Sequence, residues 1–450
     1  MNHYDLIIIG AGPGGYETAI AASALGLHVT LIERDSLGGT CLNRGCIPTK
    51  ALAQCARAVT DIGRSGEFGI DVPAFTPSFQ RAIERKDSIV SSLRDGIPQL
   101  LAGVNVVKGE ATFKDTTTIT VGDTEYTAPH IIVATGSSPA SLPITGAEYA
   151  VSSDFILSMT SLPDSIAIIG GGVIGMEFAS ILNAYGVEVT VIEYCKEILP
   201  TFDRDISKRL RQLLSRQGIR FVTSAAATSI APDGTVSYEA KGKPVSVTAE
   251  MVLMAVGRKP VIPTGIDRLG VEITRRGITV DDNMYTGVGG IYAIGDVNGR
   301  CQLAHAATAQ GRRALAHLLG RESGTSLDII PSAVYTTPEC AMVGLTGEQC
   351  DAQEIPHSDI KVTLRGNGRA MTLGETDGLV KLICSDPLDP GPQRILGCHV
   401  MAPEADLLVQ EVAVAMTAGL SPAQLADTIH AHPTIAEAIR DVAAMAGRLQ

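Results

Sequence analysis

Two cysteines stand five positions apart within residues 38–50, a stretch whose residue types suit redox chemistry. In a regular α-helix, positions five apart have Cα atoms about 8–9 Å from each other, beyond the roughly 4.4–6.8 Å that a disulfide spans. A bond between Cys41 and Cys46 therefore requires a distorted turn, and Gly45 permits one. Pro48 lacks the amide hydrogen that a helix interior needs, so we expect the irregular start of a helix that continues through residue 53. Strained or exposed disulfides are the readily reducible ones, so the spacing indicates a redox pair.

The alternative for these thiols is a pair of buried, unreactive cysteines that pack as small hydrophobic residues, the commoner situation inside cells. Three neighbouring features favour the redox pair. They are the flanking glycines, the start of a helix, whose dipole lowers the pKa of a thiol, and Lys50, four residues beyond Cys46.

A glycine-rich turn near the start of the chain has the composition of a dinucleotide-binding fingerprint. It follows an apolar run at residues 6–9, expected to be a buried strand, and precedes an alanine-rich helical stretch to residue 25. Such glycines allow a tight turn, close approach to a pyrophosphate and packing of the helix on the strand. The turn contains Gly10, Gly12, Gly14 and Gly15. A second predicted strand, 28–32, ends in Glu33, at the distance expected for a carboxylate that binds a ribose hydroxyl.

The whole arrangement recurs 160 residues later, where an apolar run at 166–169 precedes a second glycine turn and a strand at 187–192 ends in Glu193. The repeated turn contains Gly170, Gly172, Val173, Ile174 and Gly175. One such fingerprint is a weak signal, but a repeat at matched spacing is specific, so we predict two dinucleotide-binding domains. Glu193 favours NAD over NADP, because a carboxylate suits a free 2′-hydroxyl and repels a 2′-phosphate. Lys196 is expected to be a solvated side chain.

Two further apolar runs end in small residues that could approach a flavin. One closes on Thr135 and Gly136, and the other closes on Gly295 and Asp296 before a helix that runs to residue 319. Asp296 could bind the ribityl chain or a phosphate of a flavin, or the dipeptide could be an ordinary turn.

The last part of the chain combines predicted strands at 333–335, 359–364 and 378–384 with alanine-rich helical stretches from residue 405 onward. Within these stretches, His432 is followed five residues later by Glu437. Three interpretations stay open. His430 and His432 could form a metal site, a histidine could cap a helix that begins near Pro433, or Glu437 could orient a histidine as a general base.

The bulk composition restricts the class of protein. A chain of 450 residues is too long for one core and suggests about three units. Abundant glycine and only 4% aromatic residues suit parallel α/β layers, and a net charge of −12 without tryptophan argues against nucleic acid. No apolar run is long enough to span a membrane, and the N-terminus is typical of a first strand, not of a signal peptide. Nine irregularly spaced cysteines indicate mostly free thiols, and therefore a soluble protein of the cytoplasm or another reducing compartment.

Together these motifs resemble the flavin disulfide reductase family over essentially the whole chain. The resemblance rests on the cysteine box, both fingerprints, and residues 134–136, 295–296, 335–339 and 430–437. It implies an α/β fold with two Rossmann-like dinucleotide-binding domains, a central segment and an α+β dimerisation domain. The expected boundaries are 1–144 for the FAD-binding domain, 145–260 for the NAD-binding domain, 261–327 for the central segment that completes the FAD domain, and 328–450 for the interface domain.

The resemblance further implies oxidation of dihydrolipoamide with FAD and NAD, by a homodimer that acts on the free dithiol or on a lipoyl-bearing carrier domain. No metal, membrane or nucleic acid is implied. Cys41 would exchange with the substrate and Cys46 would face the flavin. Lys50 and Glu177 would pair near the isoalloxazine, and His432 with Glu437 would act from the partner chain.

The cofactor-binding residues that the resemblance implies come from both fingerprints and the turns around them. They are Gly10, Gly12, Gly14, Gly15, Glu33, Gly39, Thr40, Lys50, Ala111, Thr135, Gly136, Asp296, Leu303, Ala304 and His305, with Gly170, Gly172, Val173, Ile174, Gly175, Glu193, Gly257 and Arg258. Two positions depart from the common pattern: Arg44 stands where a small apolar residue is usual, and Gln310 replaces a frequent glutamate.

There are two kinds of alternative to this function: other reductases with the same architecture, and a protein without catalytic activity. Glutathione-type reductases use NADPH and typically carry basic residues where Glu193 stands. Mercuric reductases typically add a C-terminal cysteine pair, whereas Cys398 is the last cysteine here. A nucleotide-binding or structural subunit without activity is disfavoured by the intact cysteine pair and by His432 with Glu437.

Overall fold

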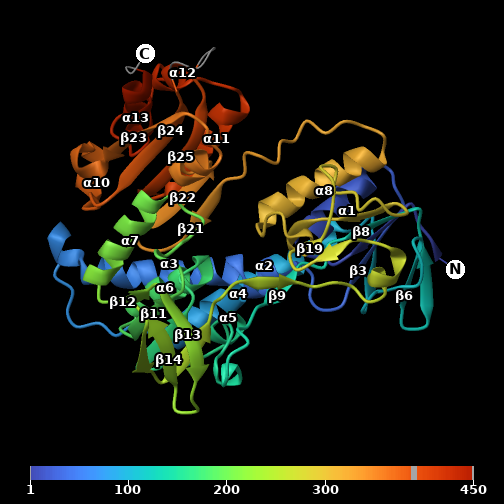
Figure 1. Cartoon of the computed structure of the whole chain (residues 1–450), viewed down its shortest axis with the longest axis horizontal. Coiled ribbons are helices and arrows are strands. Elements are labelled where there is room, and N and C mark those ends of the chain that lie inside the picture. The colour runs from blue at the N-terminus through green and yellow to red at the C-terminus, as the bar shows by residue number, and fades with distance from the viewer. Residues whose placement is uncertain (1, 387–392, 448–450) are drawn as a thin grey trace.

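The computed structural model describes residues 2–386 and 393–447, which form three lobes, each built around one main sheet (Figure 1). The N-terminal lobe carries blue and yellow segments, the second lobe is green, and the C-terminal lobe is orange to red. The α/β fold that the sequence predicts is confirmed. In the described ranges, no helix is long and apolar enough to cross a membrane.

A five-stranded parallel sheet organises the first lobe. Its central strands are buried on both faces, as parallel sheets require, which explains their continuous apolar sequences. In spatial order the strands are β20 (Ile291–Ala293), β8 (His130–Val133), β2 (Leu6–Ile9), β3 (Val29–Glu33) and β4 (Asn105–Lys108). Because β20 pairs with β8, the chain returns to its first sheet after building the second lobe.

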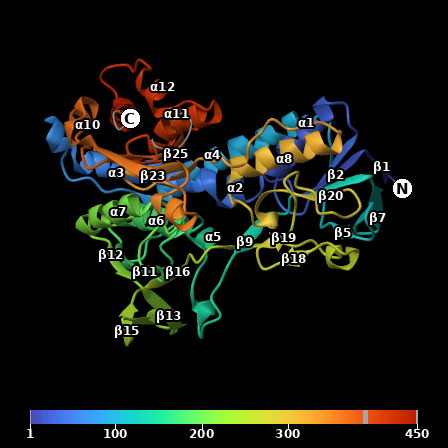
Figure 2. The same ribbon diagram turned by 45° about the horizontal axis from the view of Figure 1, so that its top comes forward.

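Two helices, α1 (Pro13–Ala24) and α8 (Ala304–Leu318), lie side by side in this lobe (Figures 1 and 2). A Cβ at Gly311 would lie 1.9 Å from the Thr18 hydroxyl, so glycine allows their close contact. Short strands complete the lobe: β1 (Asn2–His3), β5 (Thr112–Phe113), β6 (Thr118–Val121), β7 (Thr124–Thr127), β9 (Ser137–Pro139), β17 (Arg258–Pro260), β18 (Ile273–Thr274) and β19 (Gly277–Ile278).

The second lobe repeats the parallel arrangement. Its main sheet contains β12 (Arg220–Thr223), β11 (Glu188–Glu193), β10 (Ser165–Ile169) and β16 (Met251–Met254), with helices α5 (Ser153–Ile156), α6 (Val173–Ala184) and α7 (Arg204–Arg216). An antiparallel sheet that the sequence patterns did not predict follows β12. Its strands are β13 (Ala225–Ile230), β14 (Thr235–Ala240) and β15 (Lys243–Thr248).

An antiparallel sheet forms the third lobe, in the order β21 (Ser332–Val334), β22 (Glu339–Gly344), β25 (Ile395–Ala402), β24 (Leu379–Ser385) and β23 (His357–Thr363). Its helices are α9 (Gly347–Ala352), α10 (Gly368–Leu373), α11 (Ala405–Thr417), α12 (Pro422–Ala426) and α13 (Glu437–Gly447). Alternate residues of β24, such as Val380 and Leu382, pack with α11 and α13, whereas Leu379 packs toward the second lobe. Helix α13 begins at Glu437, so the expected start near Pro433 is wrong by a few residues.

Three helices connect the lobes: α2 (Gly39–Arg44), α3 (Cys46–Gly63) and α4 (Phe79–Leu100). In both views α3 lies between the second and third lobes (Figures 1 and 2). Leu52 and Ala56 of α3 share one apolar core with Phe178 of α6 and Val334 of β21. The helix that begins with a cysteine is therefore held by residues from both other lobes.

Candidate active site

The two cysteines lie on either side of a break between α2 and α3. Gly45 separates the helices with φ −142° and ψ −114°, far from helical values. Cys46 is the first residue of α3, and Pro48 follows within its first turn, where no amide hydrogen is needed. The predicted irregular helix start is confirmed, and both thiols open into the same cavity.

The two thiols have different acidities in this environment. A hydrogen bond from the Cys41 thiol, together with the nearby Lys50 charge, lowers the pKa of Cys46 to about 7. The same hydrogen bond and burial raise the pKa of Cys41. In the dithiol form, Cys46 is therefore the residue that holds a thiolate near neutral pH.

An ion pair lies beside the thiols. Lys50 Nζ is 2.7 Å from Glu177 Oε1 and 3.0 Å from Oε2, and Glu177 is only 3% exposed. The backbone N–H of Tyr335 donates to the same Oε1 at 3.0 Å, and Lys50 Nζ lies 4.7 Å from the centroid of the Tyr335 ring. The Tyr335 hydroxyl donates to Asp406 Oδ2 at 3.1 Å. The pair thus joins the connecting helix α3 to α6 of the second lobe and to Tyr335, which directly follows β21 in the third lobe.

The two glycine turns have matching geometry. Gly10 has φ +102° and a Cβ there would lie 2.4 Å from the Ala134 carbonyl oxygen; Gly170 has φ +110° and a Cβ would lie 2.3 Å from that of Ala255. A Cβ at Gly12 or Gly172 would meet nothing within 4 Å. Each turn therefore leaves open space in front of a helix N-terminus, as a bound pyrophosphate requires.

The acidic residues at the two strand ends are also held alike. Glu33 accepts the Ala11 and Asp35 N–H groups, both at 2.7 Å. Glu193 accepts the Gly171 N–H group at its Oε2 and the Cys195 N–H group at its Oε1, 2.6 Å away. Each fixed carboxylate keeps free lone pairs, so each can accept the hydroxyls of a ribose. Lys196 is exposed, as expected.

One cavity of about 1010 Å³ contains both turns, both acidic residues and the thiols. Nineteen of the predicted cofactor residues line it: Gly10, Gly12, Gly14, Glu33, Gly39, Thr40, Lys50, Thr135, Gly136, Gly170, Gly172, Val173, Ile174, Glu193, Gly257, Arg258, Asp296, Leu303 and Ala304. The fit to two extended dinucleotides rests on this continuous space and on the two open turns.

Four predicted cofactor residues lie outside this lining. A Cβ at Gly15 would be 1.9 Å from the Gly10 carbonyl oxygen, and one at Gly175 would be 2.0 Å from that of Gly170. Both glycines therefore allow the helix to pack closely against the turn that precedes it. Ala111 is 6% exposed in the core of the first lobe. The exposed His305 lies 2.7 Å, through Nε2, from the Pro331 carbonyl oxygen.

A polar junction forms where the first sheet meets the second lobe. Arg258 donates from Nε to the Ser137 hydroxyl and from Nη2 to its carbonyl oxygen, each at 2.7 Å, and Ser137 donates to Asp296. The sequence patterns did not single out Ser137, whose only local signal is its place after Gly136. Gln310, buried at 1% exposure, accepts a hydrogen bond from the Gly295 N–H group at 2.7 Å. The side-chain amide therefore provides the acceptor at this position, where a glutamate is frequent.

The histidine pair lies in the third lobe. His432 Nδ1 is 3.0 Å from Glu437 Oε1, and the His432 side chain is 78% exposed. Hydrogen bonds from the Thr434 N–H group and from His432 lower the pKa of Glu437. His430 Nε2 is instead 2.7 Å from Glu411 Oε1, with its side chain 5% exposed. His432 does not line the cavity of its own chain, and no metal-binding cluster occurs within residues 2–386 and 393–447.

Two residues beside this site were not assigned a role from the sequence. Tyr335 bridges Lys50 and Asp406. Because it directly follows β21, far from Lys50 along the chain, no sequence spacing indicates this contact. The second residue is Glu339, whose pKa is raised to about 7, mainly by burial and secondarily by the charge of Asp406. Its Oε2 has no hydrogen-bond partner among the described residues.

Arg44 forms an ion pair with Asp35 at the edge of the cavity.

Comparison with known proteins gives consistent matches over the chain. The family described as pyridine nucleotide-disulphide oxidoreductase matches residues 4–311, and its dimerisation domain matches residues 330–443. A dihydrolipoyl dehydrogenase from Chlamydia trachomatis is 39% identical over 98% of this chain and 97% of its own length. Another from Geobacillus stearothermophilus is 37% identical over 98% and 96%. The HOCl-induced flavoprotein disulfide reductase RclA from Escherichia coli superimposes with a TM-score of 0.86, at 29% identity over 98% of this chain and all of that one.

Proposed function

The chain belongs to the pyridine nucleotide-disulphide oxidoreductase family, and from this premise we propose that it oxidises dihydrolipoamide to lipoamide and reduces NAD⁺ to NADH. The observation that carries the proposal is the shared cavity, which joins the thiols to both nucleotide fingerprints. The match to the dimerisation domain supports a homodimer. The lipoyl group would be free or carried on a protein domain.

FAD and NAD are the cofactors of this enzyme. Gly12, Glu33 and Asp296 would hold FAD in the first lobe, and Gly172 and Glu193 would hold NAD in the second. Bound FAD supplies two-electron transfer between the thiols and NAD⁺. The proposed domains are 1–144 and 261–327 for FAD, 145–260 for NAD and 328–450 for the interface. The three main sheets support this division, and among the described strands only β17, at the end of the range 145–260, pairs instead with β9 of the first lobe.

The chain's own residues account for the thiol exchange. In the oxidised enzyme Cys41 and Cys46 would form a disulfide. His432 of the partner subunit, held through Nδ1 by its glutamate, would take a proton on Nε2 from dihydrolipoamide. The resulting thiolate attacks the sulfur of Cys41, and the Cys46 sulfur leaves as a thiolate. The second substrate thiol then attacks the mixed disulfide, releases lipoamide and leaves Cys41 as a thiol.

The electrostatics of the thiols suit these roles. A leaving group departs more readily when the pKa of its thiol is low, and Cys46 is the thiol whose pKa is lowered to about 7. Lys50, held by Glu177 and Tyr335, would remain beside it as a fixed cation. A cytoplasmic or other reducing location is proposed from the odd number and irregular spacing of the nine cysteines.

Reduction of NAD⁺ by dihydrolipoamide tests the function directly. The wild-type holoenzyme should turn over, and Cys46→Ser should lose turnover together with the long-wavelength absorption that a thiolate against flavin produces after reduction. Cys55→Ser, nine residues further along the same helix, should retain both and serves as the control. A wild-type holoenzyme without activity, or a Cys46→Ser variant with the band unchanged, would refute the assignment.

A further inference from the structure

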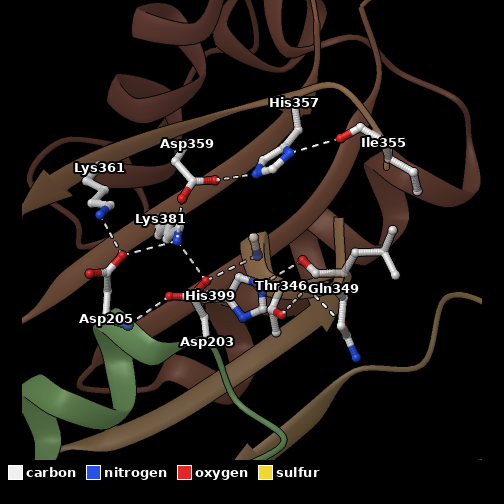
Figure 3. Close-up of polar contacts among 12 residues, drawn as sticks. Asp203, Asp205, Thr346, Gln349, Ile355, His357, Asp359, Lys361, Lys381 and His399 are labelled. Carbon is white, nitrogen blue, oxygen red and sulfur yellow. Dashed lines mark hydrogen bonds and ion pairs between the residues drawn. The ribbon is translucent and has the colours of Figure 1, made fainter. Parts of the chain in front are cut away.

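A buried lysine outside the active site gathers three carboxylates. Lys381, in the middle of β24, has a side chain that is 3% exposed. Its Nζ lies 2.7 Å from Asp203 Oδ2, 3.1 Å from Asp205 Oδ2 and 2.6 Å from Asp359 Oδ2 (Figure 3). Burial alone would lower the pKa of Lys381, but hydrogen bonds to Asp203 and Asp359 raise it. The side chain is therefore an ammonium that requires its partners.

Asp203 ties this lysine to the second lobe. Its carboxylate is fully buried, and Oδ1 accepts the Asp205 N–H group at 2.9 Å as the N-cap of α7. Oδ2 faces Lys381 and also accepts the N–H group of Gly347, the first residue of α9, at 3.4 Å. One carboxylate thus orders the start of a helix in the second lobe against the third-lobe sheet.

The segment that ends at Asp203 begins at the NAD site. It follows Glu193, and Pro200 and Thr201 line the cavity. The Leu199 N–H group donates to the Gly171 carbonyl oxygen at 2.8 Å, so the segment lies directly on the second glycine turn. Leu199 has φ +47°, a conformation that a leucine keeps only when both sides hold it. Gly171 holds the Leu199 N–H group on one side. On the other side the Leu199 carbonyl oxygen accepts the Phe202 N–H group at 2.8 Å and the Ser207 hydroxyl at 3.3 Å, at the start of the helix that Asp203 caps.

Other polar contacts between α7 and the third lobe are more exposed. Arg209 donates to the Asp377 carbonyl oxygen at 2.9 Å, and Arg216 lies 3.4 Å from the 44%-exposed Asp377 carboxylate. Lys361 pairs with Asp205 but is 42% exposed. Exposed ion pairs contribute little, whereas removal of one partner of a buried pair is strongly disruptive. Lys361 therefore provides a matched control for Lys381.

We propose that Lys381 is a positioning residue for the NAD site: by its buried ion pair with Asp203 it fixes residues 194–203 against the second glycine turn. The inference rests on the proposed function, because it assigns NAD to that turn. Loss of the ammonium leaves the buried Asp203 carboxylate at the end of this segment without a counter-charge. The segment then relaxes, and NAD(H) binds more weakly, while the thiols and the FAD side of the cavity stay as they are.

The test uses Lys381→Met in the full-length FAD-loaded dimer. We expect the KM for NAD⁺ and the Kd for NADH each to rise by about tenfold or more, the signature of lost binding, while kcat changes little. The rate at which dihydrolipoamide reduces the enzyme, followed by its long-wavelength absorption, should stay within about twofold of wild type, since that step precedes NAD⁺. Lys361→Met should leave all of these quantities unchanged.

Two further variants separate charge from folding. Asp203→Asn keeps an N-cap oxygen but removes the buried charge pair, and should reproduce the selective loss of NADH affinity even if Lys381→Met does not fold. Lys381→Arg keeps the charge and should restore most of the affinity. Unchanged NADH binding in folded Lys381→Met or Asp203→Asn would overturn the proposal, as would an equal loss in the dithiol step. If wild-type enzyme binds NADH but dihydrolipoamide does not reduce it, the proposed function fails while the NADH titration still tests Lys381.

Discussion

Replacing Glu193 by glutamine should erode the preference for NAD⁺ over NADP⁺. Glu193 is 6% exposed and is held at the end of β11 by N–H groups of Gly171 and Cys195, so it cannot move away from a ligand easily. Two unit charges of the same sign about 4 Å apart repel by about 4 kcal/mol at an effective dielectric constant of about 20. This energy corresponds to roughly a thousandfold in binding, and screening by salt reduces it.

We therefore expect wild-type kcat/KM to favour NAD⁺ by more than about a hundredfold, and Glu193→Gln to reduce this ratio at least about tenfold. The assay is initial-rate kinetics with saturating dihydrolipoamide and each nucleotide in turn, at low and high salt. Glu188→Gln removes the same charge from the opposite, exposed end of β11 and should leave the ratio unchanged. Equal efficiencies with both nucleotides in the wild type, or a ratio that both variants change alike, would refute the reasoning.

Three further predictions address the thiols, the general base and a buried acid. Each homodimer of Cys46→Ser or His432→Gln chains should be nearly inactive, whereas mixed dimers of the two should regain up to about half of wild-type activity, because one of the two symmetric sites is intact. If mixed dimers are inactive while wild-type chains exchanged in the same way stay active, the thiols and the base belong to one chain. The long-wavelength absorption of dithiol-reduced enzyme should increase with pH around a midpoint of about 7, because the hydrogen bond from the neighbouring thiol lowers the pKa of Cys46 to that value and the thiolate predominates above it; a band constant across this range would contradict the assignment. Burial is the main cause that raises the pKa of the Glu339 carboxyl to about 7 in the folded protein. The contribution of this carboxyl to stability is therefore complete below the unfolded pKa of about 4.3 and is lost as the pH rises through the folded pKa. Glu339→Gln should therefore gain Tm relative to wild type between about pH 5 and about pH 8, and a Tm difference independent of pH would show that this carboxyl is not perturbed.

The features that could be predicted from the sequence are those with a local physical cause. A buried parallel strand needs a continuous apolar run, and a tight turn at a strand end needs glycine, so both glycine turns and the acidic residues at the following strand ends could be predicted. The helix break between the thiols also has a local cause, because the cysteine spacing is incompatible with a regular helix and Gly45 lies between them.

The features that could not be predicted depend on contacts between distant parts of the chain. Tyr335 meets Glu177 across 158 positions, and Lys381 meets Asp203 across 178, so neither pair has a spacing signal. The β13–β15 sheet was missed because its strands are partly exposed and contain no continuous apolar run, as in the mostly exposed Lys243–Thr248. The start of α13 was misplaced because Pro433 and Thr434 suit a helix N-terminus but precede the helix by three residues or more.

The outward orientation of His432 has a consequence for how the enzyme behaves on dilution. A separated chain retains the thiols and both glycine turns in one cavity, but its His432 side chain, held by the buried Glu437, faces solvent on another lobe. If catalysis requires the base from a second copy, the specific activity follows the fraction of chains that are paired. Well below the dissociation constant of the pair, total turnover should then vary with the square of protein concentration, by mass action. Reduction of the thiols by a small chemical reductant, which needs no base, should remain first order in protein.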